Sequence, residues 1–430
     1  MRHVHIILLS ALLCLTLGAG AQDTVRMTLD SCLRYAYGHN LSVLDAELGR
    51  EGAEVTLAGA RMGFLPSVSA SASTGLSWSD NTTRSSSYGA TASLPLFSGL
   101  ANLRTLQQSG ASLEQKGLQV QQARNSVGAQ VVSAYLTILM NEEKLSYQRE
   151  VLETSRQQQL EGELKYRVGK ILESDYRLLE ASYLSAQTEI DNTRLTIENN
   201  RSALADLLGY DGGAVIAVVP SADSLTADGR GVDPFDSILA RSQRNLPDWQ
   251  INDLNVDIAR LGVEIARSEF LPSLSLNAGV AYSDGAVVSD NPATSLGGGL
   301  NSSLTLGLSV PIFNRGAAIT SYRKSKLSLR EAEIAHRQTL IDLKDDVEKL
   351  YTETLQALNR FRASEALAAA YHSSYEVYVL KYAQGAVTTV EMLQQQDKYL
   401  SALNDWLQYK YSYLLAEKQL DIYTGKEIRL

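Results

Sequence analysis

The chain has 430 residues and carries 48 acidic against 39 basic side chains, a formal net charge of −9. An acidic chain without a basic cluster argues against nucleic acid or an anionic membrane surface as a ligand. The two cysteines are Cys14 and Cys32. Because Cys14 lies in an apparent secretion signal, the mature chain cannot form an intrachain disulfide.

The N-terminus is typical of a secretory signal peptide. Arg2 precedes an apolar stretch from Ile6 to Leu17, and Ala19-Gly20-Ala21 follows as a cleavage site. The apolar stretch is too short to span a bilayer as a helix. We therefore expect residues 1–21 to be removed and the mature chain to begin near Gln22.

A short motif occurs twice, and each copy opens a run of alternating apolar and small polar residues. Phe64-Leu65-Pro66-Ser67 returns as Phe270-Leu271-Pro272-Ser273. A period of two predicts β-strands. A strand that is apolar on one face and rich in Ser and Gly on the other is typical of a membrane β-barrel. One face of a soluble sandwich would explain any single run equally well. The predicted strands cover about residues 66–79 and 86–97 in the first half, and about 272–283 and 300–313 in the second.

Aromatic side chains mark the ends of these strands, as in the aromatic girdles at the two interfaces of a membrane barrel. The candidates are Phe64, Phe97, Phe270 and Phe313 at the ends next to the helices, and Trp78, Tyr88 and Tyr282 toward the hairpin turns. Four strands cannot close a barrel, and an open sheet edge is not viable in lipid. We therefore expect the chain to oligomerise, and three copies would give twelve strands.

The two strand pairs belong to two repeated halves of the chain. Tyr135 corresponds to Tyr351 and Gly209 to Gly425, in addition to the repeated strand motif. Such self-similarity overrides the usual expectation of two or three unrelated domains for this length. Each repeat is expected to run helix, strand, strand, long helix, turn, helix. The predicted organisation is a first repeat at residues 22–211, a linker at 212–232 with a short strand at Val215–Val219, and a second repeat at 233–430.

The placement of proline permits very long helices after each strand pair. No proline occurs between Leu96 and Val219, or from Ile312 to the C-terminus. Each stretch is interrupted once, at Tyr166-x-x-Gly169 and at Tyr382-x-x-Gly385, which predicts a helix C-cap followed by a turn. The first long helix, from about Leu100 to Lys165, would measure about 100 Å.

Apolar residues recur along both long helices at heptad spacing. This spacing predicts supercoiled packing against neighbouring helices. The seam residues are Val127, Val131, Ala134, Ile138, Asn141 and Leu145 in the first half, and Leu343, Val347, Leu350, Thr354, Ala357 and Phe361 in the second.

The order of these elements and their motifs resembles the TolC-like outer-membrane efflux proteins, or outer membrane factors, over essentially the whole mature chain. The motifs that carry the resemblance are Thr28-Leu29-Asp30-Ser31-Cys32-Leu33, Phe64-Leu65-Pro66, Leu94-Pro95-Leu96-Phe97, Tyr166-x-x-Gly169 and Leu207-Leu208-Gly209, with their second-half copies. The resemblance implies an α+β membrane protein: a homotrimer whose twelve-stranded β-barrel in outer-membrane lipid continues into a twelve-helix periplasmic α-barrel. It also implies a periplasmic adaptor (membrane fusion) protein and an inner-membrane transporter, such as an RND or ABC pump, as partners.

The sequence carries no recognisable catalytic motif, so we expect neither an enzyme nor a cofactor or metal site. The histidines of the mature chain, His39, His336 and His372, lie far apart without metal-ligand spacing. Ser321-x-x-Lys324 matches a fragment of serine-acylase sites, but the companion motifs are missing. The expected function is that of an exit duct that exports small molecules or proteins.

Two other channel or surface functions remain as alternatives. A free-standing outer-membrane porin predicts eight or more strands in one chain and no long helices. A trimeric adhesin also has four strands per chain, but it predicts a single C-terminal strand block without duplication. Here the strands sit inside both repeats, which favours the duct.

The two interhelical turns are the candidate functional site. In the resembling family this region constricts the periplasmic end of the tunnel, with acids at the positions aligned with Asp175 and Glu391. Carboxylates crowded around a lumen would favour cations. The alternative is helix capping, because Thr388-x-x-Glu391 is a capping box and an acid in a first turn complements the helix dipole. The remaining aperture candidates are Tyr166, Tyr382, Gly169, Gly385, Lys170, Arg177 and Gln394.

The chain departs from the family pattern at this site. Val387 stands where relatives can carry an arginine after the second turn glycine, and Gln394 stands where a second acid can follow. Basic partners for the acids would then come from Lys170 and Arg177. The tyrosines that precede the turns are expected to pack or hydrogen-bond across the constriction.

Overall fold

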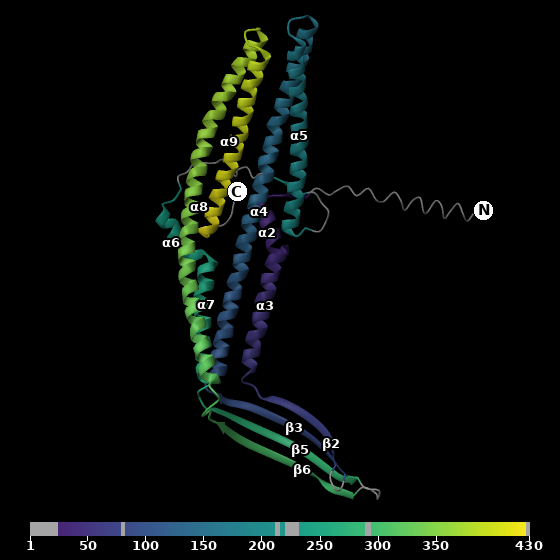
Figure 1. Ribbon diagram of the computed structural model, residues 1–430, viewed down its shortest axis with the longest axis vertical. Coiled ribbons are helices and arrows are strands. Elements are labelled where there is room, and N and C mark those ends of the chain that lie inside the picture. Colours follow the sequence, from purple (N-terminus) through teal and green to yellow (C-terminus); the bar gives the residue numbers. More distant parts are fainter. Residues whose placement is uncertain (1–24, 79–81, 211–215, 220–231, 289–293, 427–430) are drawn as a thin grey trace, which may run out of the picture. The chain divides into compact units, whose positions relative to one another are not determined.

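The computed structural model describes residues 25–78, 82–210, 216–219, 232–288 and 294–426 (Figure 1). The predicted signal peptide at residues 1–21 lies outside the described residues, as does most of the predicted linker at 212–232. Within these residues, seven elements form the first half, and seven elements of the same type and order form the second. In the first half they are β1 (Val25–Met27), α2 (Leu29–His39), α3 (Leu41–Met62), β2 (Ser67–Trp78), β3 (Thr82–Ser98), α4 (Ala101–Arg167) and α5 (Glu173–Leu208). In the second half they are β4 (Ile216–Val218), α6 (Phe235–Asn245), α7 (Pro247–Ser268), β5 (Ser273–Val288), β6 (Thr294–Ser309), α8 (Ala317–Ala383) and α9 (Thr389–Tyr423).

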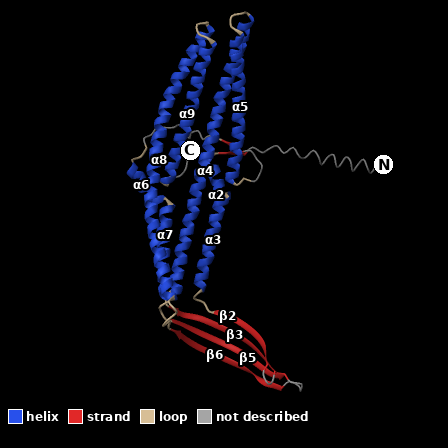
Figure 2. Ribbon diagram, in the orientation of Figure 1, coloured by secondary structure: helices blue, strands red, loops and turns tan. Residues whose placement is uncertain are grey.

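The four long strands form one antiparallel sheet in the order β2-β3-β5-β6 (Figure 2). One row of partners across the sheet is Val68, Ala92, Ala278 and Leu304. The next row is Ser69, Thr91, Gly279 and Ser303. Residues directly opposite each other in an antiparallel sheet point to the same face. The alternation seen in each strand therefore combines into one apolar face and one face of small polar residues.

The strands near the hairpin ends are longer than the alternation indicated. β3 begins at Thr82, β5 continues to Val288 and β6 begins at Thr294. The backbone ladder continues through polar pairs such as Ser86 with Asp284, which are directly opposite each other. Strand pairing needs only backbone groups, so the apolar pattern marks the membrane-type segment rather than the full strand.

The helical segment before each strand pair is two helices, where the sequence predicted one. In the first half the break falls at Asn40, whose Nδ2 donates to the Leu207 carbonyl at 2.7 Å and whose Oδ1 accepts from the Ser42 backbone N–H at 2.9 Å. In the second half α6 ends at Asn245, Leu246 is its C-cap, and Pro247 opens α7. Proline is well suited to the first turn of a helix, where its missing N–H has no partner to lose.

A short parallel sheet joins the two halves of the chain. β1 pairs with β4, which lies within the short strand predicted at Val215–Val219. Next to this sheet, the Tyr135 hydroxyl donates to the carbonyl of Val219 at 2.6 Å. Burial raises the pKa of Tyr135 to about 12, so the phenol remains a hydrogen-bond donor at neutral pH.

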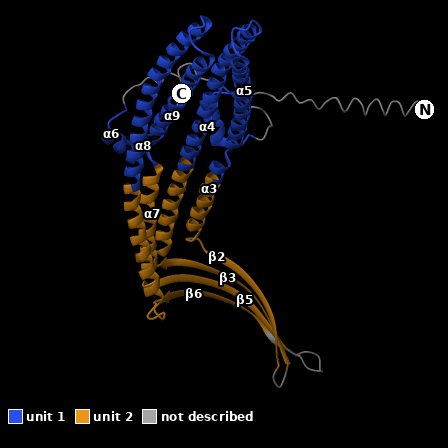
Figure 3. Ribbon diagram, turned by 45° about the horizontal axis from the view of Figure 1, so that its top comes forward, with its two compact units in different colours: residues 1–45, 122–246, 342–430 blue, residues 46–121, 247–341 orange. Residues whose placement is uncertain are grey.

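The chain divides into two compact units, coloured separately in Figure 3. The first unit comprises residues 1–45, 122–246 and 342–430, and the second comprises 46–121 and 247–341. Within the first unit, the main apolar core contains buried side chains of α2, α4, α5 and α9. Within the second unit, Gln108 of α4 donates to the carbonyl of Ile258 of α7 at 3.1 Å.

Burial confirms the heptad seams of the two long helices. Val131 and Ile138 are completely buried on α4, and Val347 and Thr354 are almost completely buried on α8. Thr354 directs its hydroxyl to the Leu350 carbonyl of its own helix at 2.7 Å. A hydroxyl on an apolar seam is therefore satisfied without a partner from another helix.

Among the described residues, no helix combines the length and apolar character needed to cross a membrane.

The described elements fit the duct better than its alternatives. The large sheet has four strands, and α4 and α8 are 67 residues long. The porin alternative predicted more strands per chain and no long helices. The adhesin alternative predicted one C-terminal strand block, whereas the strands lie in two blocks inside the chain, each followed by a long helix.

Candidate functional site at the interhelical turns

The candidate site consists of the turn between α4 and α5 and the turn between α8 and α9. In Figures 1 and 2 both turns lie at the same end of the helices, and both belong to the first compact unit. Gly169 and Gly385 adopt left-handed φ values of 72° and 73°. The following amides donate back to the helix, from Lys170 N to the Lys165 carbonyl at 2.8 Å and from Ala386 N to the Lys381 carbonyl at 2.8 Å. This is the hydrogen bonding of a glycine-terminated helix, as the sequence predicts.

Apolar side chains from three helices meet directly behind the turns. Leu179 of α5, Tyr382 of α8 and Met392 of α9 form one cluster and are 1%, 5% and 0% exposed. This cluster packs the α4–α5 hairpin against the α8–α9 hairpin. Its members other than Tyr382 were not singled out in the sequence, because single apolar residues on a helix carry no signal about which other helix they contact.

Lys165 adds a polar link between the same two hairpins. Its ammonium lies 4.2 Å from the centre of the Tyr382 ring and donates to the Tyr382 carbonyl at 3.4 Å. The same ammonium pairs with Glu161 on its own helix at 2.9 Å. A cation over an aromatic face is attracted by the ring's negative surface. Among the described residues next to the turns, Lys165 is therefore the basic residue that reaches the other hairpin.

The close approach of α4 and α5 behind the first turn depends on a glycine. Gly162 is buried, and a Cβ placed there would collide with the Cδ1 atom of Leu179. Gly162 lies in the interior of a helix, where glycine is unfavourable by about 1 kcal/mol relative to alanine. The close contact with Leu179 gives a packing reason for that cost.

The two repeat-equivalent acids have different local environments. Glu391 forms a complete capping box: its Oε2 accepts from the Thr388 backbone N–H at 2.8 Å, and the Thr388 hydroxyl accepts from the Glu391 N–H at 3.2 Å. These hydrogen bonds hold the pKa of Glu391 below its usual value. Asp175 lies half-buried in the first turn of α5, and Leu172 at its N-cap provides no side-chain hydrogen bond. Capping thus accounts for the position of Glu391 more fully than for that of Asp175.

The basic candidates differ in their contacts. Arg177 pairs with Glu180 at 2.8 Å and with Glu173 at 3.4 Å, both on its own helix. The hydrogen bond and charge of Glu180 raise the pKa of Arg177. Lys170 is exposed in the first turn. Within this chain Arg177 thus pairs with acids of its own helix, while Lys165 contacts the other hairpin.

The remaining aperture candidates lie on both sides of the turns. Tyr166 is 38% exposed and stacks on Tyr176, with ring centres 5.7 Å apart and planes at 4°. Tyr382 is buried, and its hydroxyl has no hydrogen-bond partner among the described residues. Gln394 is exposed on α9. The two turn tyrosines therefore lie in unlike surroundings despite their equivalent sequence positions.

The aromatic candidates for the membrane interface belong to the second compact unit. All are at least 40% exposed within one chain: Phe64, Phe97, Phe270, Phe313, Trp78, Tyr88 and Tyr282. Tyr88 and Tyr282 are direct partners across β3 and β5. Tyr282 also lies against Gly298 on β6, where a Cβ would collide with its ring. A large aromatic side chain that covers a strand glycine helps to hold the register of the sheet.

Farther from the turns, ion pairs and hydrogen bonds connect α4 to α9 and to α5. Lys410 of α9 donates to both carboxylate oxygens of Glu143 at 2.9 Å, and the Tyr411 hydroxyl donates to the same carboxylate at 2.8 Å. On the adjacent position, Glu142 pairs with Arg201 of α5 at 2.7 Å. Acidic neighbours on α4 therefore bind two different helices of the first unit.

Comparisons with known sequences identify relatives of the chain. The family model described as outer membrane efflux protein matches residues 33–210 and 239–426. The chain is 21% identical to the outer membrane protein TolC of Vibrio cholerae over 393 residues, which cover 88% of this chain and 86% of TolC. It is 26% identical to the alkaline protease secretion protein AprF of Pseudomonas aeruginosa over 170 residues, or 40% of this chain and 34% of AprF.

A solved structure shares the fold. The outer membrane protein VceC of Vibrio cholerae superposes with a TM-score of 0.76 over 93% of this chain and 97% of VceC, at 15% identity. At that identity the likeness establishes the architecture rather than the cargo.

Proposed function

The chain belongs to the outer membrane efflux protein family. We propose that three copies assemble into a channel-tunnel whose strands close into one barrel and whose aperture lies at the two interhelical turns. Membership confirms the resemblance drawn from the motifs, the α+β fold class and the outer-membrane location with a periplasmic extension. The protein is an exit duct of an efflux or secretion system. Proteins of this family are transport channels. The number of copies, the position of the aperture and the partner proteins are what we propose here.

The observation that carries the trimer is the four-stranded sheet. One face carries aliphatic side chains such as Val68, Leu304 and Leu308, which are exposed by 74%, 73% and 69% in a single chain. Within the described chain, β2 and β6 each pair on one side only. In lipid every backbone polar group needs an internal partner, so both edges require another copy. Three copies supply twelve strands, an even number within the range of outer-membrane barrels.

The aperture proposal rests on the convergence of helix ends. Two helical hairpins end side by side in each chain, held together by the Leu179–Tyr382–Met392 cluster and by Lys165. Three copies would bring six such ends, with Asp175 and Glu391, around one axis. A ring of carboxylates there would favour cations. Glu391 can serve its capping box and the lumen together, because one carboxylate has about four lone-pair sites.

The partners follow from the same assignment. A duct that ends in the periplasm needs an energy source from the inner membrane, so a periplasmic adaptor and an inner-membrane transporter of the RND or ABC type complete the system. TolC and AprF are named for an outer membrane protein and for the secretion of alkaline protease. The name of AprF fits proteins as cargo, and the family description as efflux proteins fits small molecules, so both cargo classes are proposed for this chain.

Channel formation is tested on the purified full-length protein. Native mass spectrometry gives the number of copies, and planar bilayers give single-channel conductance. A trimer with discrete conductance steps is the expected result. A folded protein that stays monomeric in detergent, or a trimer that never conducts, would refute the duct.

The aperture is tested by Asp175→Ala/Glu391→Ala, with Glu198→Ala as the matched control because Glu198 is an exposed acid elsewhere on α5. We expect the double variant to conduct more and to lose cation preference, and the control to match the wild type. Thr388→Ala removes the hydroxyl that caps the Glu391 N–H and keeps both the Glu391 carboxylate and the Thr388 N–H that binds it, so it tests whether conductance depends on the cap hydroxyl. Unchanged conductance and selectivity in the double variant would assign both acids to helix capping alone.

A further inference from the structure

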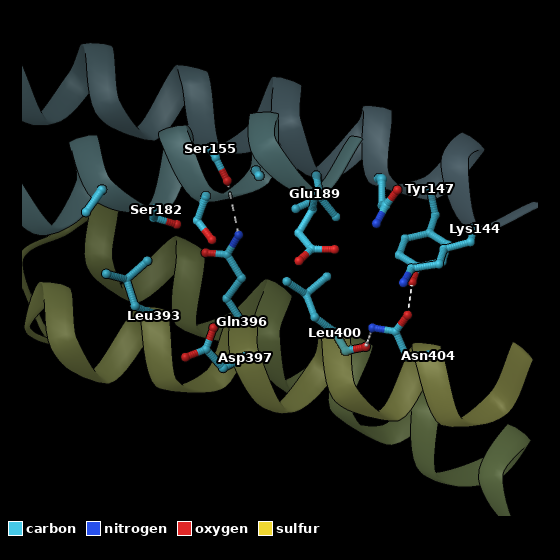
Figure 4. Close-up of a pocket in the computed structure, with 15 residues that line it drawn as sticks. Lys144, Tyr147, Ser155, Ser182, Glu189, Leu393, Gln396, Asp397, Leu400 and Asn404 are labelled. Carbon is cyan, nitrogen blue, oxygen red and sulfur yellow. Dashed lines mark hydrogen bonds between the residues drawn. The ribbon is translucent and has the colours of Figure 1, made fainter. Parts of the chain in front are cut away.

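A cavity of about 370 Å³ lies between α4, α5 and α9 in the first compact unit (Figure 4). Small side chains on α5 make room for it, among them Ala181, Ser182 and Ala186. Its volume falls at the lower end of the range for small-molecule sites. It is distinct from the interhelical turns and from every residue assigned to the aperture.

Two glutamines that line the cavity each have a buried acceptor without a donor among the described residues. Gln148 and Gln396 are 8% and 3% exposed, and the Oε1 atom of each has no hydrogen-bond partner among the described residues. The Nε2 atom of Gln396 is already used, because it donates to Ser155 Oγ at 3.3 Å. An unsatisfied buried carbonyl is unfavourable, because it has lost its hydrogen bonds to water. A ligand with N–H donors would relieve that cost.

The charges around the cavity favour a cation. Figure 4 shows the Glu189 carboxylate projecting from α5 between the side chains of Gln396 and Tyr147. Asp397 also lines the cavity, and Lys144 is the basic residue among the lining side chains. Two carboxylates against one ammonium leave one formal negative charge, which a monovalent cation would neutralise.

Tyr147 lies in the electrostatic field of the Glu189 carboxylate. Its burial and the nearby Glu189 carboxylate raise the pKa of Tyr147, so the phenol stays protonated and donates to Asn404 Oδ1. Because the Tyr147 hydroxyl donates its proton to Asn404, it does not donate to Glu189. The negative charge of Glu189 therefore remains available to a ligand in the cavity.

We propose that this cavity binds a small organic cation with several N–H donors, such as a primary ammonium or guanidinium group. The charge pairs with Glu189, and the N–H groups donate to the amide oxygens of Gln148 and Gln396. Charge-assisted hydrogen bonds of this kind are stronger than neutral ones. An anion would meet the carboxylates, and a purely apolar ligand would leave both amide oxygens without donors. The site goes beyond the proposed function and does not depend on it.

The test is a ligand-observed NMR titration of the folded full-length protein with four probes of similar size. Butylammonium carries a charge and three N–H donors, tetramethylammonium carries a charge without donors, 1-butanol is neutral and butyrate is an anion. We expect saturable binding of butylammonium, at least about tenfold tighter than that of the other three. Added salt should weaken it.

Three variants locate the site. Glu189→Gln should weaken butylammonium binding by about tenfold or more, and Ala186→Leu should abolish it by filling the cavity. Glu198→Gln, an exposed acid on the same helix, is the matched control and should bind as the wild type does. No saturable binding, equal binding of all four probes, or full affinity in Glu189→Gln would overturn the proposal. Conductance measured on the same samples keeps this outcome separate from that of the channel assignment.

Discussion

Gly209 offers a quantitative test of how the helical hairpins are anchored. It ends α5 with a left-handed φ of 69° and lies against the end of α2. A Cβ placed on Gly209 would sit 2.6 Å from the carbonyl oxygen of His39 and 3.1 Å from its carbonyl carbon. Gly425 makes the same kind of approach in the second half, with 2.7 Å to the Cβ of Asn245. Gly209→Ala therefore forces two backbones apart.

The expected cost has two parts. A left-handed conformation costs an L-residue about 1–2 kcal/mol, and forced overpacking adds about 1–3 kcal/mol. Gly209→Ala should therefore destabilise the fold by about 2–5 kcal/mol. Gly169 has the same type of φ, at 72°, but nothing within 4 Å of a Cβ, so Gly169→Ala should cost only the first part. Gly38→Ala, at a helical glycine with open space around it, should stabilise by about 0.5–1 kcal/mol.

The assay is unfolding of the purified full-length protein, followed by circular dichroism in one detergent for all three variants. The midpoint of the unfolding transition should fall most for Gly209→Ala and less for Gly169→Ala. It should rise slightly for Gly38→Ala. Equal midpoints for Gly209→Ala and Gly169→Ala would refute the argument, because they would mean that the contact with His39 contributes nothing beyond the backbone conformation.

The other predictions concern the capping box and the charge network. Thr388→Ala should cost about 1 kcal/mol, because it removes the N-cap of α9. The Thr388 backbone N–H and then its hydroxyl lower the pKa of Glu391 from 4.5, so this stabilisation is present above that pH and is lost as the pH falls through the lowered value. Because Thr388→Ala keeps the backbone N–H, the variant that tests this is Glu391→Gln, which cannot titrate and should show less acid destabilisation than the wild type in melts at decreasing pH. Lys410→Met should destabilise by about 1–3 kcal/mol, because among the described residues it leaves the Glu143 carboxylate with the Tyr411 hydroxyl alone. Urea unfolding of Lys410→Met/Glu143→Leu should recover part of that loss, and a double variant less stable than Lys410→Met would contradict this explanation.

Local patterns in the sequence determined the repeating elements of this protein. The period of two in the strand segments, the heptads along α4 and α8 and the turn glycines Gly169 and Gly385 each depend on neighbouring residues. Such features are encoded within a few residues, since they reflect backbone geometry and the direction of side chains. The order of the motifs then sufficed for the family and for the location in the outer membrane.

Tertiary structure decided which residues meet across helices. The sequence placed basic partners for the aperture at Lys170 and Arg177, yet Lys165 is the residue that reaches Tyr382, and Arg177 binds acids of its own helix. The capping box at Thr388-x-x-Glu391, by contrast, was predicted from the sequence because it depends on residues three positions apart, and the structure confirms it.

The cavity beside Glu189 is likewise a feature that the sequence alone did not predict. Ala181, Ser182 and Ala186 are ordinary small residues on a helix surface, and nothing in their local sequence indicates a void. The cavity lies where residues of α4, α5 and α9, which are far apart in the sequence, come together. Periodicity follows from bonds and angles between neighbours and can be predicted from the sequence. The depth of a groove and the partner of a charge follow from the packing of segments that are far apart in the chain.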